Sequence, residues 1–178
     1  MMAQNEELKE YMYDLESYFH ENSRGLETVG KVMDVGLNDD GRGNTSLLID
    51  RSIPFNKKGD AYAEHVDIIP ESRDLLQSMP FNIVIYCDIS VGLQSITPEA
   101  LKSTRDDITG YFNEIGKPKM LKSIDVSDEK TNTISVIVES SRRITINKSE
   151  EPSTLFGVID SISKELYNAC DKLDQVLA

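Results

Sequence analysis

The sequence predicts an α+β fold, a two-layer sandwich in which long N-terminal, central and C-terminal helices cover a mainly antiparallel sheet. Apolar residues repeat at helical spacing in three segments and alternate with polar residues in several others, and turn residues separate these segments. The expected order is about α-β-β-β-α-β-β(-β)-α. The length of 178 residues is typical of one domain, and no repeat or linker divides it. We therefore expect a single domain over 1–178, with its first few residues disordered.

The first predicted helix lies near the N-terminus. Its apolar residues recur at three- and four-residue steps, acidic residues fill the other positions, and Gly25 offers a stop. The apolar set is Leu8, Tyr11, Met12, Leu15, Tyr18 and Phe19. His20 suits the negative end of the helix dipole, so we assign it to the helix end rather than to catalysis.

Strands are expected next. Between Val29 and Ile53 the apolar period changes to two around a polar turn at Asn38–Asn44, which predicts a β-hairpin with its tight point at Asp40–Gly41. Ala61–Ile69 is a candidate third strand. Glu71–Met79 is expected to form a short helical turn before Pro80. Phe81–Ile89 is rich in β-branched residues and is the best candidate for a central strand buried on both faces.

The second helix has the clearest boundaries. Thr97 is the expected N-cap, Pro98 suits the first helical position, and Gly116 ends the helix. Short alternating segments around Ile124–Val126, Ile134–Val138 and Ile144–Ile146 follow. Their alternation predicts an antiparallel meander with one buried and one wet face.

The last helix carries a heptad pattern, and it leaves two interpretations open. Its apolar residues are Leu155, Ile159, Ile162, Leu166, Ala169, Leu173 and Val176, at alternating steps of four and three. We favour a helix that lies across its own sheet, because Phe156 and Leu177 widen the stripe beyond a narrow seam. The alternative is packing against a second copy of the chain, which would make a homodimer.

The sequence shows no complete catalytic or metal-binding motif, and we expect no catalytic, cofactor-binding or metal-binding residues. On a strand, His65 and Asp67 would share one face, and Asp88 ends the apolar strand, but a metal site needs three or four ligands. Cys87 and Cys170 are expected to be buried apolar residues. The Asn38–Asn44 segment lacks the ligands of a calcium loop, so turn chemistry explains it better. Arg142 and Arg143 could hold an anion, although a solvated hairpin accounts for them.

The net charge of the chain limits the kinds of molecule that it is expected to bind. The chain has a net charge of −12, and a chain this acidic is repelled by phosphate backbones, so no direct nucleic-acid binding is expected. The acidic N-terminus is not that of a signal peptide, and no apolar stretch is long enough to cross a membrane, which predicts a cytoplasmic protein without a membrane partner. Such a chain would attract a polypeptide with a basic surface.

The leading hypothesis is a non-enzymatic protein-binding domain: an adaptor, an escort chaperone, or an inhibitor of the immunity-protein kind. The candidate partner-binding residues lie on the last and first helices: Leu155, Ile159, Ile162, Leu166, Leu173, Glu7, Glu10 and Asp14. The size, charge and element order resemble those of the dimeric acidic chaperones that escort secreted effector proteins in bacteria. The resemblance implies a protein partner and no cofactor.

Three alternatives stay open. An acidic inhibitor that mimics nucleic acid is supported by residues 1–30, which hold seven acidic and two basic residues. Binding that collapses with added salt would favour this mimicry. A structural subunit of a larger assembly, such as a virus particle, would have the same sequence features. The least favoured alternative is a metal-dependent or acid/base enzyme that uses Asp88 with His65 or Asp67.

Overall fold

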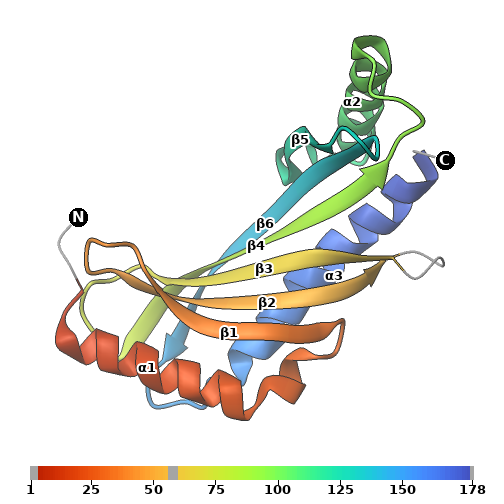
Figure 1. Cartoon of the computed structure of the whole chain (residues 1–178). Helices are drawn as coiled ribbons and strands as arrows, with labels where there is room; N and C mark the ends of the chain where they lie inside the picture. Colours follow the sequence, from red (N-terminus) through yellow and green to blue (C-terminus); the bar gives the residue numbers. More distant parts are fainter. Residues whose placement is uncertain (1–3, 56–59, 177–178) are drawn as a thin grey trace.

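The computed structural model describes residues 4–55 and 60–176. The predicted disorder of the first residues falls largely on residues 1–3, outside the described part. Three α-helices and one six-stranded antiparallel sheet occur in the described residues, which confirms the α+β class (Figure 1). The elements are α1 (Glu6–Glu21), η1 (Ser23–Leu26), β1 (Lys31–Asp39), β2 (Thr45–Phe55), β3 (Asp60–Pro70), β4 (Ser78–Gly92), α2 (Pro98–Glu114), η2 (Pro118–Met120), β5 (Leu121–Asp128), β6 (Thr133–Asn147) and α3 (Thr154–Val176).

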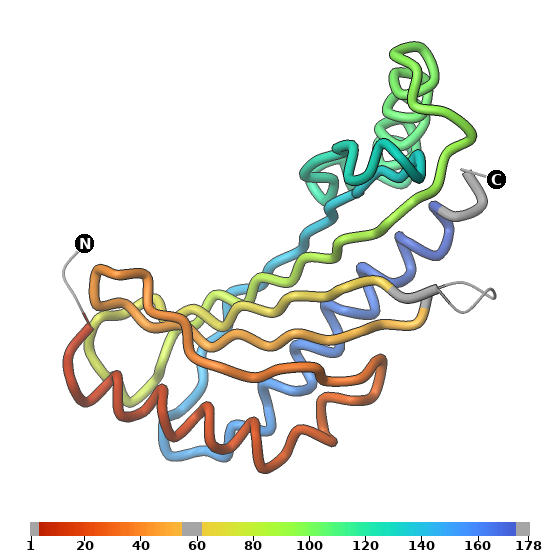
Figure 2. Tube along the Cα trace, viewed as in Figure 1, coloured from red at the N-terminus to blue at the C-terminus, as the bar shows by residue number. Residues whose placement is uncertain are grey.

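The sheet has the strand order β1-β2-β3-β4-β6-β5. Strands β1 to β4 form an antiparallel meander, the chain then passes through α2, and the β5–β6 hairpin completes the sheet when β6 pairs with β4 (Figure 2). The meander predicted after the second helix is this single hairpin. Four strands precede α2, one more than the expected order, because Ala61–Ile69 and Phe81–Ile89 are both strands. The two segments expected at Ile134–Val138 and Ile144–Ile146 are one continuous strand, β6.

The short helical turn predicted at Glu71–Met79 is wrong. Residues 71–77 form bends and irregular structure, and Met79 already pairs with Ile146 as part of β4. The Ser72 hydroxyl accepts a hydrogen bond of 3.1 Å from the backbone N–H of Asp74. Such local side-chain bonds compete with helical backbone bonds, and burial of Met79 in the sheet favours the extended chain.

The helices begin where the sequence indicates. The side chain of Thr97 accepts a hydrogen bond of 3.2 Å from the backbone N–H of Ala100 at the start of α2, as predicted. The residue after the C-cap of α2 is Gly116, whose φ of 72° is the left-handed conformation that glycine adopts at low cost. At α1 the N-cap is Asn5, whose Oδ1 accepts a hydrogen bond of 2.9 Å from Leu8.

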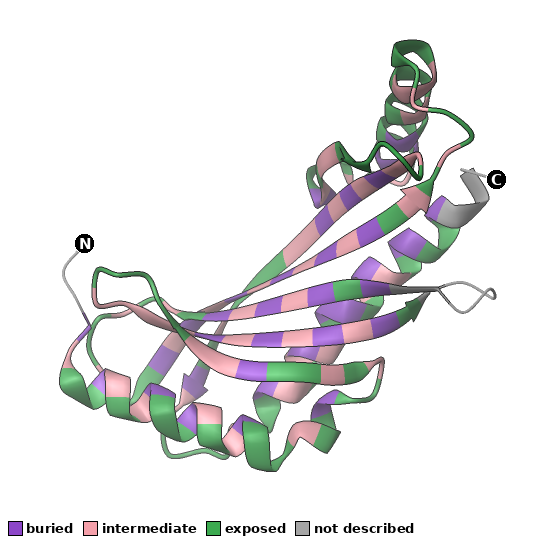
Figure 3. Ribbon diagram, viewed as in Figure 1, coloured by how far each residue is buried: buried purple, intermediate pink, exposed green. Residues whose placement is uncertain are grey.

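Helices α1 and α3 pack on the same face of the sheet. Helix α1 lies against β1 and β2, α3 lies against β4 and β6, and α2 contacts α3 through a 2.7 Å hydrogen bond from the Tyr111 hydroxyl to the Ala169 carbonyl. Figure 3 shows the resulting alternation of buried and more exposed residues along the strands. In the described residues, no helix covers the opposite face, which we call the open face.

The expectation that Phe81–Ile89 is buried on both faces is therefore wrong, although its central position is confirmed. The residues of β4 that face the helices are fully buried, whereas Asn82, Val84, Tyr86 and Asp88 on the open face are only half-buried. The apolar run reflects a strand that is long and central, not one covered by helices on both sides.

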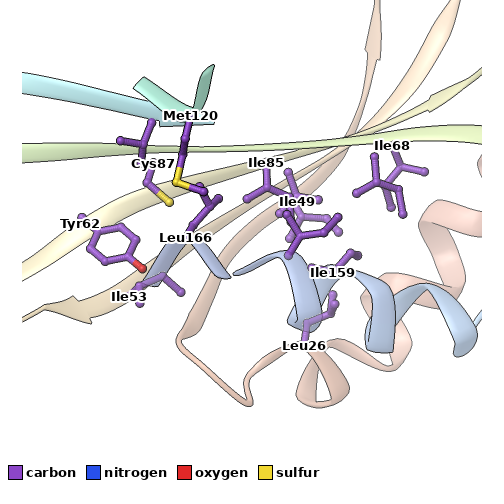
Figure 4. Close-up of a cluster of buried hydrophobic side chains, with 14 of the residues drawn as sticks. Leu26, Ile49, Ile53, Tyr62, Ile68, Ile85, Cys87, Met120, Ile159 and Leu166 are labelled. Carbon is purple, nitrogen blue, oxygen red and sulfur yellow. The ribbon is translucent and has the colours of Figure 1, made fainter. Parts of the chain in front are cut away.

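The heptad stripe of α3 lies in the protein's own core. Its side chains at Leu155, Ile159, Ile162, Leu166 and Leu173 are at most 1% exposed. Figure 4 shows Ile159 and Leu166 within a cluster of buried sheet residues that includes Ile49, Ile85 and Cys87. A partner could reach the stripe only if α3 left the sheet, so the structure supports the core interpretation for these five residues.

A charged pair is buried within this core. The Arg51 side chain on β2 and the Glu64 side chain on β3 are both 0% exposed, and Arg51 Nε donates a 2.7 Å hydrogen bond to Glu64 Oε1. The Arg51 guanidinium also donates to the Leu26 carbonyl at 2.7 Å and to the Ser163 hydroxyl on α3. Arg51 therefore ties the sheet to η1 and α3.

Within residues 4–55 and 60–176, no helix has the length and apolar composition to span a membrane.

Candidate functional site

The strongest candidate surface is the open face of the sheet. Because side chains alternate across a strand, each strand sends every second residue to this face. The outward residues of its central part are Leu48, Asp50, Ala63, His65, Asp67, Val84, Tyr86, Asp88, Ile137 and Glu139. Most of these are half-buried, so they form a continuous surface of aliphatic, aromatic and acidic side chains.

The register places four of these residues in one row across the sheet. Asp50 pairs with His65, His65 pairs with Tyr86, and Tyr86 pairs with Glu139. His65 Nδ1 lies 2.6 Å from Asp50 Oδ1. The His65 ring stacks on the Tyr86 ring, with the centroids 4.7 Å apart and the planes at 25°. Asp67 lies two residues further along β3 and pairs with Val84 on β4.

Three carboxylates converge on this row, and we call Asp50, Asp67 and Glu139 with His65 and Tyr86 the central cluster. Burial raises the pKa of the Tyr86 hydroxyl, and the negative charges of Asp67, Asp50 and Glu139 raise it further. Burial also raises the pKa of Asp67; the charge of His65 opposes this shift, whereas Asp50 and Glu139 reinforce it. Like charges are thus held close together beside an aromatic ring.

Asp67 gives the first testable prediction, an effect of pH on stability. Its pKa is higher in the folded protein than in the unfolded chain, so the cost of burying its charge is absent below the unfolded pKa and develops as pH rises above it. Asp67→Asn is therefore expected to raise the unfolding temperature at pH 7, by up to a few degrees, and to leave it nearly unchanged near pH 3. Thermal unfolding of both proteins across this pH range is the measurement, and a gain of equal size at both pH values would contradict it.

The residues considered for an enzyme do not assemble as a metal site. His65 and Asp67 share one face, as predicted, but the hydrogen-bond partner of His65 is Asp50. Asp88 lies on the same face and accepts a hydrogen bond from the Ser135 hydroxyl. In the described part of the chain, no group of three or more His, Cys, Asp or Glu side chains is placed to hold a metal ion.

The two cysteines are buried, as expected, and both are free thiols. Burial raises the pKa of Cys87 well above its ordinary value, and it raises the pKa of Cys170 to about 12. Both thiols are therefore protonated at neutral pH, and a protonated thiol is a poor nucleophile.

The acidic residues predicted on the first helix form a second surface. Glu7, Glu10 and Asp14 are exposed on the side of α1 that faces away from the sheet. Tyr13 lies beside them and is 63% exposed. This surface carries negative charge but little apolar area, in contrast to the open face. The structure brings these three acids together and places them away from the buried α3 stripe.

A pocket of about 850 Å³ lies at one end of the open face. Its floor comes from β3, β4 and β6, and its walls come from the β1–β2 turn and from the segment that joins β3 to β4. Arg42, Arg73 and Arg143 all line it. No sequence motif indicates this pocket, since its residues come from segments far apart along the chain.

Two segments considered in the sequence meet at this pocket. The Asp40 carboxylate accepts hydrogen bonds of 2.8 Å from the backbone N–H of Arg42 and from the Asn44 amide, and these bonds lower the pKa of Asp40. These hydrogen bonds confirm that Asn38–Asn44 contains a turn held by its own side chains, as the sequence predicts. Arg142 and Arg143 are exposed, as expected, but they lie within the long strand β6 and not at a hairpin. Arg143 Nε donates a 2.6 Å hydrogen bond to Glu71 Oε2.

Comparison of the chain with protein-family models, curated proteins and solved structures finds no match.

Proposed function

We propose that this protein is a non-enzymatic binding module that holds a basic polypeptide segment on the open face of its sheet. One observation carries the proposal. In the described residues, α1 and α3 pack on one face of the sheet and α2 contacts α3, whereas the opposite face presents half-buried aliphatic and aromatic side chains surrounded by carboxylates. Adaptor, escort chaperone and immunity-type inhibitor all require such a surface. We place the module in the cytoplasm, where its free thiols would stay reduced.

Charge complementarity identifies the occupant. The central part of the open face carries four acids, Asp50, Asp67, Asp88 and Glu139, against two bases. His65 lies 2.6 Å from Asp50, and Lys122 Nζ lies 3.6 Å from Glu139 Oε1, so the acids outnumber the bases by two. Tyr86 and Val84 lie among these acids on β4, and the three carboxylates of the central cluster are close enough to Tyr86 to raise the pKa of its hydroxyl. A lysine or arginine can pack its aliphatic stem on such a ring while its charged end meets the carboxylates.

The geometry suits an extended segment. Neighbouring strands lie about 4.8 Å apart, so the row from Asp50 to Glu139 spans about 14 Å across β2, β3, β4 and β6. Alternate side chains of an extended peptide are about 7 Å apart and fall on one side. Two or three basic side chains of one segment could therefore meet the row together. The acidic surface of α1 has the same sign of charge, but its aromatic side chain is the exposed Tyr13, whereas the open face combines Tyr86 with aliphatic side chains.

The test compares two sets of charge changes on the same chain. The probe is a fluorescein-labelled nonapeptide of alternating arginine and threonine. We expect the open-face variant, Asp50→Asn/Asp67→Asn/Glu139→Gln, to bind it at least about tenfold more weakly, measured by fluorescence anisotropy at physiological ionic strength. The matched control, Glu7→Gln/Glu10→Gln/Asp14→Asn on α1, also removes three negative charges and should change the affinity less than about threefold.

Tyr86→Ser separates the apolar part of the interface from its charges. Its loss of affinity should persist at high salt, whereas the loss from the three neutralised acids should shrink because salt screens charge. If the α1 variant lost as much affinity as the open-face variant, binding would follow net charge alone. That result would reject the open face as the binding surface and favour the acidic mimicry of nucleic acid.

A further inference from the structure

The pocket at the end of the open face brings three arginines together with three acids, Asp40, Asp67 and Glu71. Of the seven arginines in a chain with a net charge of −12, three line this pocket. Arg42 comes from the β1–β2 turn, Arg73 from the segment between β3 and β4, and Arg143 from β6. Arginines from three separate segments therefore line one cavity of about 850 Å³. Arg143 pairs with Glu71, and Arg73 pairs with the neighbouring Asp74.

Two of the three acids that line the pocket are already engaged. The Asp40 carboxylate is held by N–H groups of its own turn, and Glu71 forms an ion pair with Arg143. The third, Asp67, lies on the floor and belongs to the central cluster. In the described part of the chain, the Arg42 guanidinium makes no hydrogen bond or ion pair, so its donors are available to an anionic group.

The rim of the pocket is fixed before any ligand arrives. The Gln4 side chain exchanges two 3.0 Å hydrogen bonds with the backbone of Thr45 on one wall. The backbone N–H of Asn5 donates a 2.8 Å hydrogen bond to the carbonyl of Arg73 on the other. The start of α1 therefore holds both walls in place, and a ligand loses little affinity to ordering the site.

We infer that this pocket binds a carboxylate of the polypeptide partner, and the inference rests on the proposed function. A planar guanidinium matches a carboxylate with two parallel hydrogen bonds. Asp67 and Glu71 in the lining limit the negative charge the pocket tolerates, which favours a carboxylate over a doubly charged phosphate. The neutral amides of Asn38, Asn44 and Asn82 can pair with the adjoining peptide groups.

The pocket and the central cluster belong to one surface. Arg143 at the pocket and Glu139 in the cluster lie four residues apart on β6, which is about 13 Å along the strand, and both face outward. The row runs across the strands and the pocket lies along them, so the segment must bend after its first basic residue. The preferred segment therefore has an acidic residue about four positions from that basic residue, beyond the bend. The two opposite charges fix the direction in which the segment lies.

The first experiment examines the pocket without a partner. Nα-acetyl-glutamate α-amide is titrated into ¹⁵N-labelled protein, with the neutral glutamine analogue and inorganic phosphate as comparison probes. We expect saturable shifts of the backbone resonances of Arg42, Gly43 and Arg73 with the glutamate probe only. Arg42→Gln should weaken this binding at least about fivefold, whereas Arg105→Gln on α2 should leave it unchanged. No saturable shift, or a response to phosphate alone, would overturn the inference.

The second experiment uses the arginine–threonine peptide extended by a glutamate four residues before its first arginine, and the same peptide with glutamine. Wild type should prefer the glutamate peptide by about three- to tenfold, and Arg42→Gln should abolish the preference. Equal binding of both peptides would overturn the carboxylate site while the proposed function stands. Binding of the glutamate probe without binding of either peptide would instead reject the polypeptide as the source of the carboxylate, together with the proposed function.

Discussion

Replacing Arg51 with methionine is expected to lower the free energy of unfolding by about 3–5 kcal/mol. Arg51 and Glu64 have fully buried side chains that pair with each other in the core. Removal of the guanidinium would leave the Glu64 carboxylate buried without its counterion, and Glu64 Oε2 already has no hydrogen-bond partner. The Leu26 carbonyl and the Ser163 hydroxyl would lose their donor as well. Urea unfolding followed by circular dichroism measures the change.

Two further variants separate this mechanism from a simple loss of packing. Arg51→Met/Glu64→Leu removes the Arg51–Glu64 pair and should recover much of the lost stability, because a buried ion pair and an apolar pair of similar volume are often close in free energy. Recovery stays incomplete because Asp160, 3.4 Å from Arg51 and 14% exposed, loses its partner in both variants. Arg105→Met on the exposed side of α2 is the surface control; it loses one exposed 3.1 Å hydrogen bond to the Ile124 carbonyl and should stay within about 1 kcal/mol of wild type. A double variant no more stable than Arg51→Met alone would contradict the account.

The buried pair also bears on how the open face arises. Arg51 on β2 contacts the sheet partner Glu64, the η1 carbonyl of Leu26 and Ser163 of α3. These contacts fix the position of α3 on one face of the sheet. With α1, α2 and α3 all on that side in the described residues, the outward side chains of β2, β3, β4 and β6 stay available to a partner.

Much of the fold could be predicted from local pattern. Helical spacing located α1 and α3, Thr97 and Gly116 bounded α2, and alternation located the strands. The failures have physical causes. Glu71–Met79 contains helix-compatible residues, but Met79 gains more by burial in β4. The apolar run Phe81–Ile89 suggested burial on both faces, because the sequence does not say on which side of a sheet the helices pack.

The candidate site was harder to predict because it depends on register. Alternation indicated that His65 and Asp67 share a face, but not that Asp50, Tyr86 and Glu139 lie beside them on three other strands. A signal for the buried pair was present. Along β2, Arg51 takes one of the alternate positions that are otherwise apolar: Leu47, Ile49 and Ile53. Along β3, Glu64 takes the alternate position between Tyr62 and Val66. A charge in a buried phase on each of two neighbouring strands indicates an internal ion pair.

Leu166→Asp is expected to abolish cooperative folding or to lower the unfolding free energy by at least about 4 kcal/mol. Leu166 is 0% exposed and lies in the middle of the α3 stripe, among buried residues that include Cys87 and Met120 (Figure 4). An aspartate there would put a charge into the core without a counterion. Leu166→Ala, which leaves a cavity but no charge, should cost about 2–5 kcal/mol. Thermal and urea unfolding measure both.

The matched control places the same charged side chain on the same helix, two residues further along. Asn168 is exposed, so Asn168→Asp should keep wild-type stability within about 0.5 kcal/mol.

Light scattering of the three proteins then separates the two interpretations of the heptad stripe. If the stripe packs only on its own sheet, Leu166→Ala loses stability without a change in mass. A fall from dimer to monomer with unchanged stability would instead assign the stripe to a second copy. Wild-type stability and mass in Leu166→Asp would contradict both interpretations, because a buried charge must disturb either the core or an interface.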